Sequence, residues 1–317
     1  MSLRSLLAAL FRTGTGGRPP ASRRGPAGGF AFEAGWANLL ANLGLPPSAL
    51  GDVLAAESLH PHFHYRHFTK PKRGGGRRAI AAPDSKLKRL QHEIVARYFA
   101  NQQPHPAALA YRTGKSTADH VWAHAGADVL VTADVRDFFP ATHEWRVENW
   151  WRERVEDDDL ARLLTLLTTE RGGLPQGAPT SPALGNFVNR ELDVRLTQRA
   201  DAVGARYTRY CDDLAFSWRR AEPPSDFEAG VRALLHEFGY ALHPEKGWRV
   251  QYRRDEPELV GAILTRRGRV RLPDEIHEKM RTLSWSDDPR DAPRLAGYEG
   301  YEAMIVRPPG RRRNRKK

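Results

Sequence analysis

The apolar residues of the chain follow two spacings, the alternation of half-buried strands and the three-to-four-residue repeat of amphipathic helices. Strict alternation over residues 206–218 predicts a β-hairpin that carries Asp212 and Asp213 near its turn. Helical spacing predicts a helix that begins at residues 83–85 and buries Leu87, Leu90, Ile94 and Tyr98. Further helices are expected over residues 145–167, with an acidic joint at 156–159, and over residues 181–192, with Ser181 as N-cap, 227–240 and 274–283.

Short apolar segments between these helices predict strands. Residues 64–68 and 79–82 flank the Gly-rich basic segment 70–78, which predicts a second hairpin with a glycine tip. Residues 128–133 form an apolar run that leads into Asp134. Other strands are expected over residues 248–252, 259–265 and 269–272, and one or two short helices over residues 32–57. This mixture of helices and antiparallel hairpins indicates the α+β fold class.

Length and composition narrow the class of protein. The chain has 317 residues, of which 40% are hydrophobic and 28% charged, and this suits one large domain or two closely joined ones. No apolar run approaches the roughly 20 residues of a membrane span, and the Leu/Ala stretch in residues 1–12 is too short for a signal peptide. A single cysteine, Cys211, excludes an internal disulfide framework. We therefore expect a soluble, cytoplasmic protein that does not bind membranes.

The net charge of +12 is concentrated at the two ends of the chain. Residues 1–29 hold five arginines, residues 307–317 hold seven lysines and arginines, and neither segment contains an acid. Between them, residues 60–115 hold twelve lysines and arginines against Asp84 and Glu93. Such a block favours a polyanion, most often nucleic acid, as the partner. For the tails alone, solubility or an arginine-rich coding bias explains the charge equally well.

Three carboxylates stand beside apolar strands: Asp134, Asp212 and Asp213. Two like charges about 4 Å apart repel each other by roughly 4 kcal/mol at an effective dielectric constant of about 20. A proton, an arginine or a divalent cation must offset this repulsion. Oxygen ligands suit Mg²⁺ or Mn²⁺, and two such ions assist phosphoryl transfer. One aspartate at a strand end is usually a turn or a cap, but the three together favour a metal site.

Two loops carry groups that suit phosphates and nucleotides. Glycines 74–76 allow a close backbone approach, and they are surrounded by Lys70, Lys72, Arg73, Arg77 and Arg78. Gln176-Gly177 lies in a proline-bounded loop before a predicted helix. Taken alone, each loop could equally be an ordinary solvated turn.

In their order along the chain, these motifs resemble those of a bacterial retron-type reverse transcriptase, over roughly residues 60–265. YCDD at residues 210–213 resembles the YxDD box, and ADVRDFF at 133–139 resembles the first aspartate motif. LPQGAPTSP at 174–182 resembles the Gln-Gly motif. RRAIAAP at 77–83 and LKRLQ at 87–91 resemble segments of the fingers. Two motifs differ, because HVWAH at 120–124 replaces Asn-Ala-x-x-His and LVG at 259–261 replaces Val-Thr-Gly.

The resemblance implies roles for individual residues. Asp134, Asp212 and Asp213 would be the catalytic carboxylates and, with the Val135 carbonyl, the metal ligands. Arg78 would hold the incoming triphosphate together with Lys70 or Lys72, between which the sequence does not decide. Phe139 would exclude a ribose 2′-hydroxyl, unless it only packs in the core. The nucleotide pocket would be completed by Asp137, Gln176, Gly177, Cys211 and Lys246, the last of which could also be an exposed turn residue.

The resemblance also implies a right-hand polymerase. Its parts would be a disordered basic segment (1–29), N-terminal helices and fingers (30–115), an antiparallel palm with helices (116–265), a short helical thumb (266–306) and a basic tail (307–317). The expected activity is RNA-directed DNA synthesis from dNTPs with two Mg²⁺ ions, or Mn²⁺, in anti-phage defence. Expected partners are a structured non-coding RNA, its cDNA and an effector protein encoded nearby.

Three alternatives remain open on the sequence. One is a reverse transcriptase of another lineage, such as an abortive-infection enzyme with untemplated synthesis or a diversity-generating relative. Another is a catalytically idle RNA-binding scaffold, which the joint presence of Arg78, Gln176 and the three aspartates disfavours. A metal-dependent nuclease would leave the Gln-Gly loop and the basic hairpin unexplained.

Overall fold

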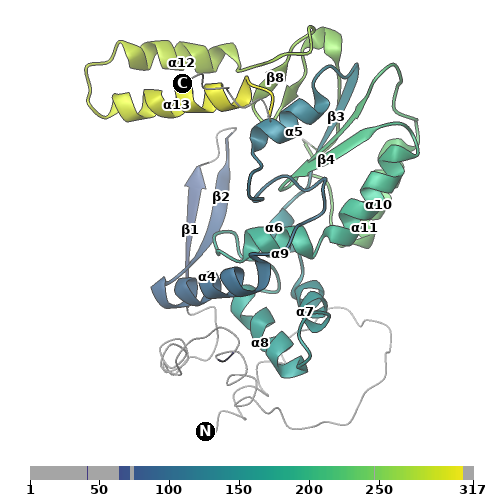
Figure 1. Cartoon of the computed structure of the whole chain (residues 1–317), viewed down its shortest axis with the longest axis vertical. Coiled ribbons are helices and arrows are strands. Elements are labelled where there is room, and N and C mark those ends of the chain that lie inside the picture. Colours follow the sequence, from purple (N-terminus) through teal and green to yellow (C-terminus); the bar gives the residue numbers. More distant parts are fainter. Residues whose placement is uncertain (1–40, 42–63, 72–74, 246, 310–317) are drawn as a thin grey trace, which may run out of the picture.

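The computed structural model describes residues 41, 64–71, 75–245 and 247–309 (Figure 1). Lys72 and Lys246 lie outside the described residues, as do residues 1–29 and nearly all of the segment 32–57 for which short helices are expected. In the described part of the chain, no helix has the length and apolar character needed to cross a membrane.

The N-terminal hairpin and the helix after it agree with the expectation. Strand β1 (Tyr65–Pro71) pairs antiparallel with β2 (Arg77–Pro83), so that Lys70 lies opposite Arg78. Helix α4 (Ser85–Phe99) begins where the Asp84 carboxylate accepts hydrogen bonds from the backbone amides of Lys86 (3.0 Å) and Leu87 (2.9 Å). In the view of Figure 1, the hairpin rises from α4 in the direction of the C-terminal helices.

The central sheet has the strand order β4-β5-β3-β6 and is antiparallel throughout. Its strands are β3 (Val129–Asp134), β4 (Arg206–Tyr210), β5 (Asp213–Trp218) and β6 (Arg249–Tyr252). Alternate residues face opposite sides, so Val131 and Phe216 join the main core while Leu130 and Ala215 join a second one. Helices α10 (Arg190–Asp201) and α11 (Phe227–Glu237) cover the first face, and α5 (Thr117–His124) covers the second.

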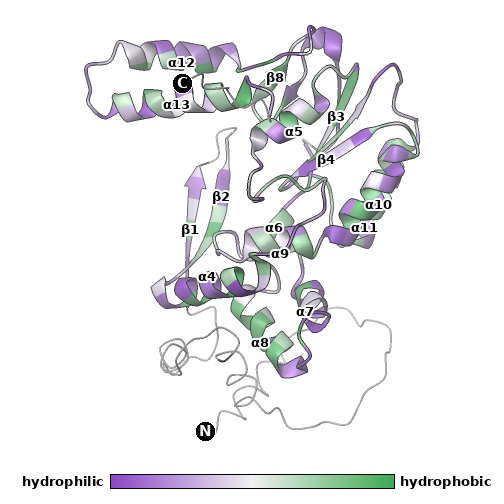
Figure 2. Ribbon diagram, viewed as in Figure 1, coloured by the Kyte–Doolittle hydropathy of each residue, from purple (hydrophilic) through white to green (hydrophobic). Residues whose placement is uncertain are grey.

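A small sheet and a helix pair complete the second face. Strands β7 (Glu258–Leu259), β8 (Ala262–Leu264) and β9 (Val270–Arg271) precede helices α12 (Asp274–Ser284) and α13 (Asp291–Ile305). The Trp122 indole of α5 donates a hydrogen bond to the Ile305 carbonyl (2.9 Å) and so anchors the end of α13. Helix α12 buries no residue and α13 buries only Ile305. In Figure 2, α12 is mostly hydrophilic, whereas hydrophilic and hydrophobic residues are mixed along α13.

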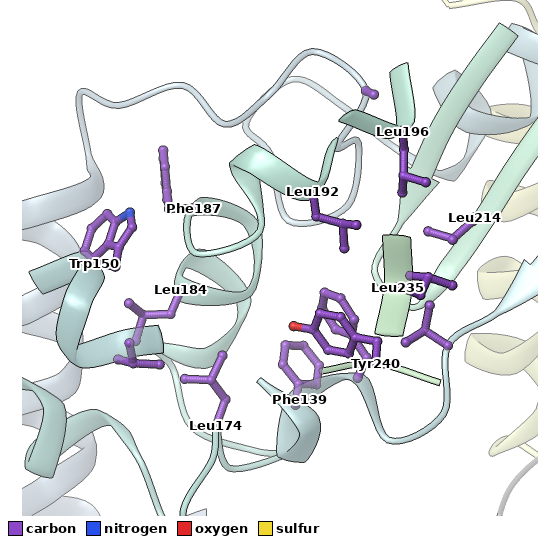
Figure 3. Packing of buried hydrophobic residues seen from close by; sticks show 14 of the residues in the cluster. Phe139, Trp150, Leu174, Leu184, Phe187, Leu192, Leu196, Leu214, Leu235 and Tyr240 are labelled. Atoms are coloured by element: carbon purple, nitrogen blue, oxygen red, sulfur yellow. The ribbon is translucent and has the colours of Figure 1, made fainter. Parts of the chain in front are cut away.

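The main core continues from the sheet to the helices around the site. It includes α6 (Phe138–Ala141), α7 (Glu144–Arg152), α8 (Asp158–Thr168) and α9 (Ser181–Phe187). Figure 3 shows Phe139, Leu174, Leu184 and Tyr240 among the side chains of this core. The core therefore fixes α6, which follows Asp134, against the loop that carries Gln176.

Several predicted elements differ from the structure in their limits. The segment 145–167 is two helices, α7 and α8, which separate at the acidic joint because the Asp157 carboxylate caps α8. The segment 181–192 is divided between α9 and α10, and the N-cap is Thr180, because the Ser181 hydroxyl instead donates to the Pro175 carbonyl (2.6 Å). The segment 259–265 is a hairpin with a turn at 260–261, and α5 and α13 were not predicted.

Candidate active site

The two aspartate motifs meet at one end of the central sheet. Asp134 is the last residue of β3 and lies opposite Asp213, the first residue of β5. The amide of Val135 donates a hydrogen bond to the Asp212 carbonyl (3.0 Å), which ties the two turns together just beyond the paired strands. Asp134 and the adjacent pair Asp212 and Asp213, which are far apart in the sequence, are thus brought to one end of the sheet by the pairing of β3 with β5.

The turn that carries Asp212 is tight. Tyr210 pairs with Asp213, so Cys211 and Asp212 form a two-residue loop between β4 and β5. Cys211 has a φ of 62° and Asp212 does not have a positive φ, which is the sign pattern of a type II′ turn. A residue other than glycine in this region costs on the order of 1 kcal/mol and is most often found where function requires the geometry.

The carboxylates of Asp134, Asp212 and Asp213 repel one another at this end of the sheet. Burial, followed by the charges of Asp212 and Asp134, raises the pKa of Asp213 to about 7. Burial, followed by the charge of Asp212, raises the pKa of the neighbouring Cys211 thiol to about 12, so this thiol stays protonated at neutral pH. A divalent cation at this end of the sheet would offset this repulsion.

The donor chemistry fits Mg²⁺ or Mn²⁺, because the edge offers carboxylate and carbonyl oxygens. In the described residues, however, no three histidine, cysteine, aspartate or glutamate side chains already form a ligand cluster. Mg²⁺ in enzymes is commonly held by one or two carboxylates together with water and substrate phosphates. The arrangement therefore suits an ion whose coordination is completed by a phosphate-bearing substrate.

A cavity of about 550 Å³ opens beside the paired aspartates. Asp134 and Asp213 line it, and so do Glu245, Trp248, Arg249 and Glu258. Val260 and Gly261 also line it, and both have positive φ values, 45° and 80°. Because valine is β-branched, this backbone conformation is a true outlier for Val260, in the segment that replaces Val-Thr-Gly. The sequence pattern gave no reason to include Glu245 and Glu258, which lie in loop and edge positions.

Phe139 and an unpredicted tyrosine flank the same edge. Phe139 lies in α6 and is 8% exposed, and its ring centroid is 6.2 Å from that of Tyr111. The Tyr111 hydroxyl donates a hydrogen bond to the Cys211 sulfur (3.6 Å), although Tyr111 is 59% exposed overall. Tyr111 stands in a loop with a φ of 56°, where no periodicity could identify it. Asp137, also at positive φ (49°), is exposed at the start of α6.

The Gln-Gly loop lies against the basic hairpin. The Gln176 carbonyl accepts a hydrogen bond from the Ala81 amide of β2 (3.0 Å). Gly177 has a φ of 137°, and a Cβ atom there would lie 2.8 Å from the Ala81 carbonyl oxygen, so only glycine allows this approach. Arg78 is exposed on the same strand, three residues before Ala81. The structure thus brings Gln176 and Gly177 to the strand that carries Arg78.

Two buried histidines contact the hairpin that carries Asp212 and Asp213. His124 of α5 lies 2.7 Å from both the Ser217 and the Thr208 hydroxyl, and His120 lies 2.7 Å from the same Thr208 hydroxyl. Both rings are buried, which lowers the pKa of His120 to about 3 and that of His124 well below its ordinary value. The segment that replaces Asn-Ala-x-x-His is therefore buried between α5 and the central sheet.

These histidines should make stability fall in acid. Below pH ~6.5 the unfolded chain takes up protons that the folded chain excludes, at a cost of about 2 kcal/mol per histidine at pH 5. His120→Leu should therefore flatten the dependence of the unfolding free energy on pH between pH 6.5 and 5, measured by urea denaturation. His92→Leu, which changes an exposed histidine of α4, is the control and should keep the full slope. A full slope in His120→Leu would contradict this account.

Comparison with known proteins decides the family. The sequence profile described as Reverse transcriptase (RNA-dependent DNA polymerase) matches residues 70–262, more than half of the chain. The chain belongs to the reverse transcriptase family. This membership confirms the resemblance and the α+β polymerase fold class expected from the sequence. The boundaries proposed for fingers, palm and thumb stay a prediction.

Within the family, the chain is similar to retron reverse transcriptases. It is 32% identical to the Retron Mx162 reverse transcriptase of Myxococcus xanthus, over 75% of this chain and 56% of that relative's length. It is 32% identical to the Retron Mx65 reverse transcriptase of the same organism, over 84% of this chain and 70% of the relative. The match to the Retron Ec73 reverse transcriptase of Escherichia coli is 36% over 46% of this chain and 51% of the relative. The chain is thus a retron-type member of the family and spans 56% of the length of the Mx162 relative.

A viral family member is similar to the chain among solved structures. It is a foamy viral protease-reverse transcriptase in complex with double-stranded DNA. The TM-score is 0.44 at 18% identity, over 75% of this chain and 36% of that one.

Proposed function

We propose that the chain is an RNA-directed DNA polymerase that copies a structured non-coding RNA into DNA and acts in anti-phage defence with an effector protein encoded nearby. The observation that carries the proposal is the register of β3 and β5, which pairs Asp134 with Asp213 and brings in Asp212 through Val135. Retron relatives that match most of this chain support the RNA-templated reading. The defence role rests on the family resemblance alone.

The three aspartates would act together on the reacting phosphate. Asp134, Asp212 and Asp213, with the Val135 carbonyl, would hold two Mg²⁺ ions, which neutralise the charge on the attacking and leaving oxygens when bound. The carboxylates orient the primer 3′-hydroxyl for in-line attack on the α-phosphate of a dNTP, with pyrophosphate as the leaving group. Because strand pairing within a packed sheet holds these carboxylates in place, the site would need little reorganisation during the reaction.

The basic hairpin would hold the triphosphate. Lys70 and Arg78 are opposite each other in the hairpin, and like charges in directly paired positions destabilise a sheet. An anion between them offsets this repulsion, and arginine favours phosphate through its forked donors. Gln176 and Gly177 lie against the same strand and would line the nucleotide pocket, with Lys72 and Lys246 assigned there by resemblance only.

Phe139 and Tyr111 would contact the sugar and base of the nucleotide. Phe139→Val should lower the preference for dNTP over rNTP, measured as the ratio of kcat/KM values, by about tenfold or more, because it removes the bulk that excludes a 2′-hydroxyl. Phe138→Leu, which changes the buried neighbour that stacks on Tyr240, should leave this ratio unchanged. An unchanged ratio in Phe139→Val would assign Phe139 to core packing alone.

Primer extension on defined templates tests the proposed activity. The purified chain is given one primer on an RNA template, the same primer on DNA, and the primer alone, each with Mg²⁺ and dNTPs. The proposal expects products complementary to the RNA, and DNA linked to RNA among nucleic acids that copurify. Extension of the primer alone would favour an abortive-infection enzyme, and no extension with any template would favour an idle scaffold.

A further inference from the structure

A second cavity, of about 800 Å³, lies at the end of the palm sheet remote from the aspartates. Its wall includes Val129, where β3 begins, whereas Asp134 ends the same strand five residues later. At about 3.3 Å per residue, the two ends are roughly 17 Å apart. Figure 1 shows β3 running from this end of the palm towards α6. The cavity is thus separate from the candidate active site.

Four arginines from three distant segments converge on this cavity. Arg220 follows β5, Arg253 and Arg254 form a short 3₁₀ helix (Arg253–Asp255), and Arg266 lies between β8 and β9. Two acids, Asp128 and Glu222, also line it. Asp128 is already engaged, because it accepts hydrogen bonds from the Arg253 guanidinium (3.2 Å) and from the Arg220 amide (2.9 Å). Positive charge therefore predominates.

Three of these arginines have guanidinium groups available to a ligand. Those of Arg220 and Arg266 make no hydrogen bond or ion pair within the described residues. Arg254 is 78% exposed, has only a 3.7 Å contact with Asp255, and lies over the Tyr252 ring at 4.9 Å. Arg253, by contrast, is fixed by Asp128 and by the Arg266 carbonyl (2.8 Å). Arg220 is held at a positive φ of 58°, which fixes where its side chain leaves the backbone.

We propose that this cavity binds the phosphodiester backbone of RNA, at a part of the RNA that is not being copied. The paired N–H donors of an arginine guanidinium match the geometry of two phosphate oxygens. Arg254 stacked on Tyr252 also offers a flat surface on which a base can stack. The inference rests on the proposed function, and it means that one RNA must reach both the active site and an anchor about 17 Å away.

Binding of a synthetic RNA hairpin at several salt concentrations tests the anchor. Arg220→Ala/Arg254→Ala/Arg266→Ala should weaken binding about tenfold and reduce the slope of log K against log salt by about 2 to 3, since each lost phosphate contact contributes nearly one. The control Arg152→Ala/Arg162→Ala/Arg232→Ala removes the same charge from ion-paired surface positions and should change the slope by less than about 1. The rate constant for dNTP addition at saturating primer–template should be equal in all three proteins.

The outcomes separate the two proposals. Unchanged hairpin affinity and slope in the cavity variant would overturn the anchor, even if polymerisation is intact. If the cavity variant loses binding to free dATP while its affinity for the RNA hairpin is unchanged, the RNA anchor is also overturned and the cavity is a nucleotide site. Absence of polymerisation in the unmodified protein would count against the proposed activity, whereas the hairpin measurement would still decide the anchor.

Discussion

Replacing Asp213 with asparagine is expected to stabilise the metal-free protein and to abolish DNA synthesis. The carboxylate is buried beside Asp134 and Asp212, and its pKa is raised to about 7. An acid whose pKa is raised on folding makes stability fall as pH rises, here between pH ~4 and ~7, by at most about 4 kcal/mol. Asparagine keeps the shape and removes the charge, so this destabilisation disappears at pH 8.

Thermal unfolding at pH 8, with and without Mg²⁺, measures this effect. The variant should unfold at a higher temperature than the original chain when EDTA is present, and it should lose most of the Mg²⁺-dependent stabilisation. Its rate of dNTP addition should fall by about 10³-fold, which corresponds to about 4 kcal/mol of transition-state stabilisation. Asp201→Asn, at an exposed carboxylate of α10, is the control and should change neither property. A less stable or fully active Asp213→Asn would contradict the assignment.

Breaking the buried ion pair beside the turn that carries Asp212 is expected to cause the largest loss of stability. Asp193 and Arg209 are both fully buried, and the carboxylate accepts from Arg209 Nε (2.8 Å) and Nη2 (2.6 Å) and from the Tyr207 hydroxyl (2.9 Å). Asp193→Leu leaves the guanidinium without its partner, which costs about 3–5 kcal/mol. The midpoint of thermal unfolding should fall by roughly 10 °C.

A double variant separates stability from function at this pair. Asp193→Leu/Arg209→Met removes both charges and should recover most of the stability, because well-packed apolar residues often replace a buried pair at little cost. Its rate of DNA synthesis should nevertheless remain below that of the original chain. Arg209 Nη1 also donates a hydrogen bond to the Cys211 carbonyl (3.1 Å), and the double variant loses this contact, which holds the turn. Arg195→Ala, which removes a surface pair with Glu237, should leave the midpoint of thermal unfolding nearly unchanged, because exposed ion pairs contribute little to stability. Full activity in the double variant would show that the turn does not need Arg209.

The strands and helices with strong periodicity could be predicted from the sequence. The sequence also indicated that Asp134, Asp212 and Asp213 belong to one site. Alternation identified the hairpin of β4 and β5, and its register with β3 follows from burial of one set of residues such as Phe216. Helix α5 escaped prediction because its buried face contains His120 and His124, which read as polar. Helix α13 buries only Ile305 and therefore leaves almost no apolar stripe in the sequence.

The parts of the site that could not be predicted depend on tertiary contacts between loops. Tyr111 reaches Cys211 from a loop one hundred residues earlier in the chain, and no local pattern marks it. Glu245 and Glu258 join the aspartates only because their segments close the same cavity. The arginines of the second cavity are scattered over three turns, where single basic residues normally indicate only solvent exposure.

Single-turnover addition of one dNTP to a primer on an RNA template, by the full chain and by its Asp134→Asn variant, tests the central claim most directly. The account predicts that the original chain adds the complement of the RNA base. It predicts that the variant binds the primer–template with equal affinity but reacts about 10³-fold more slowly. Equal rates for the two proteins, or addition that ignores the template base, would contradict the claim that the edge formed by Asp134, Asp212 and Asp213 is a template-directed polymerase centre.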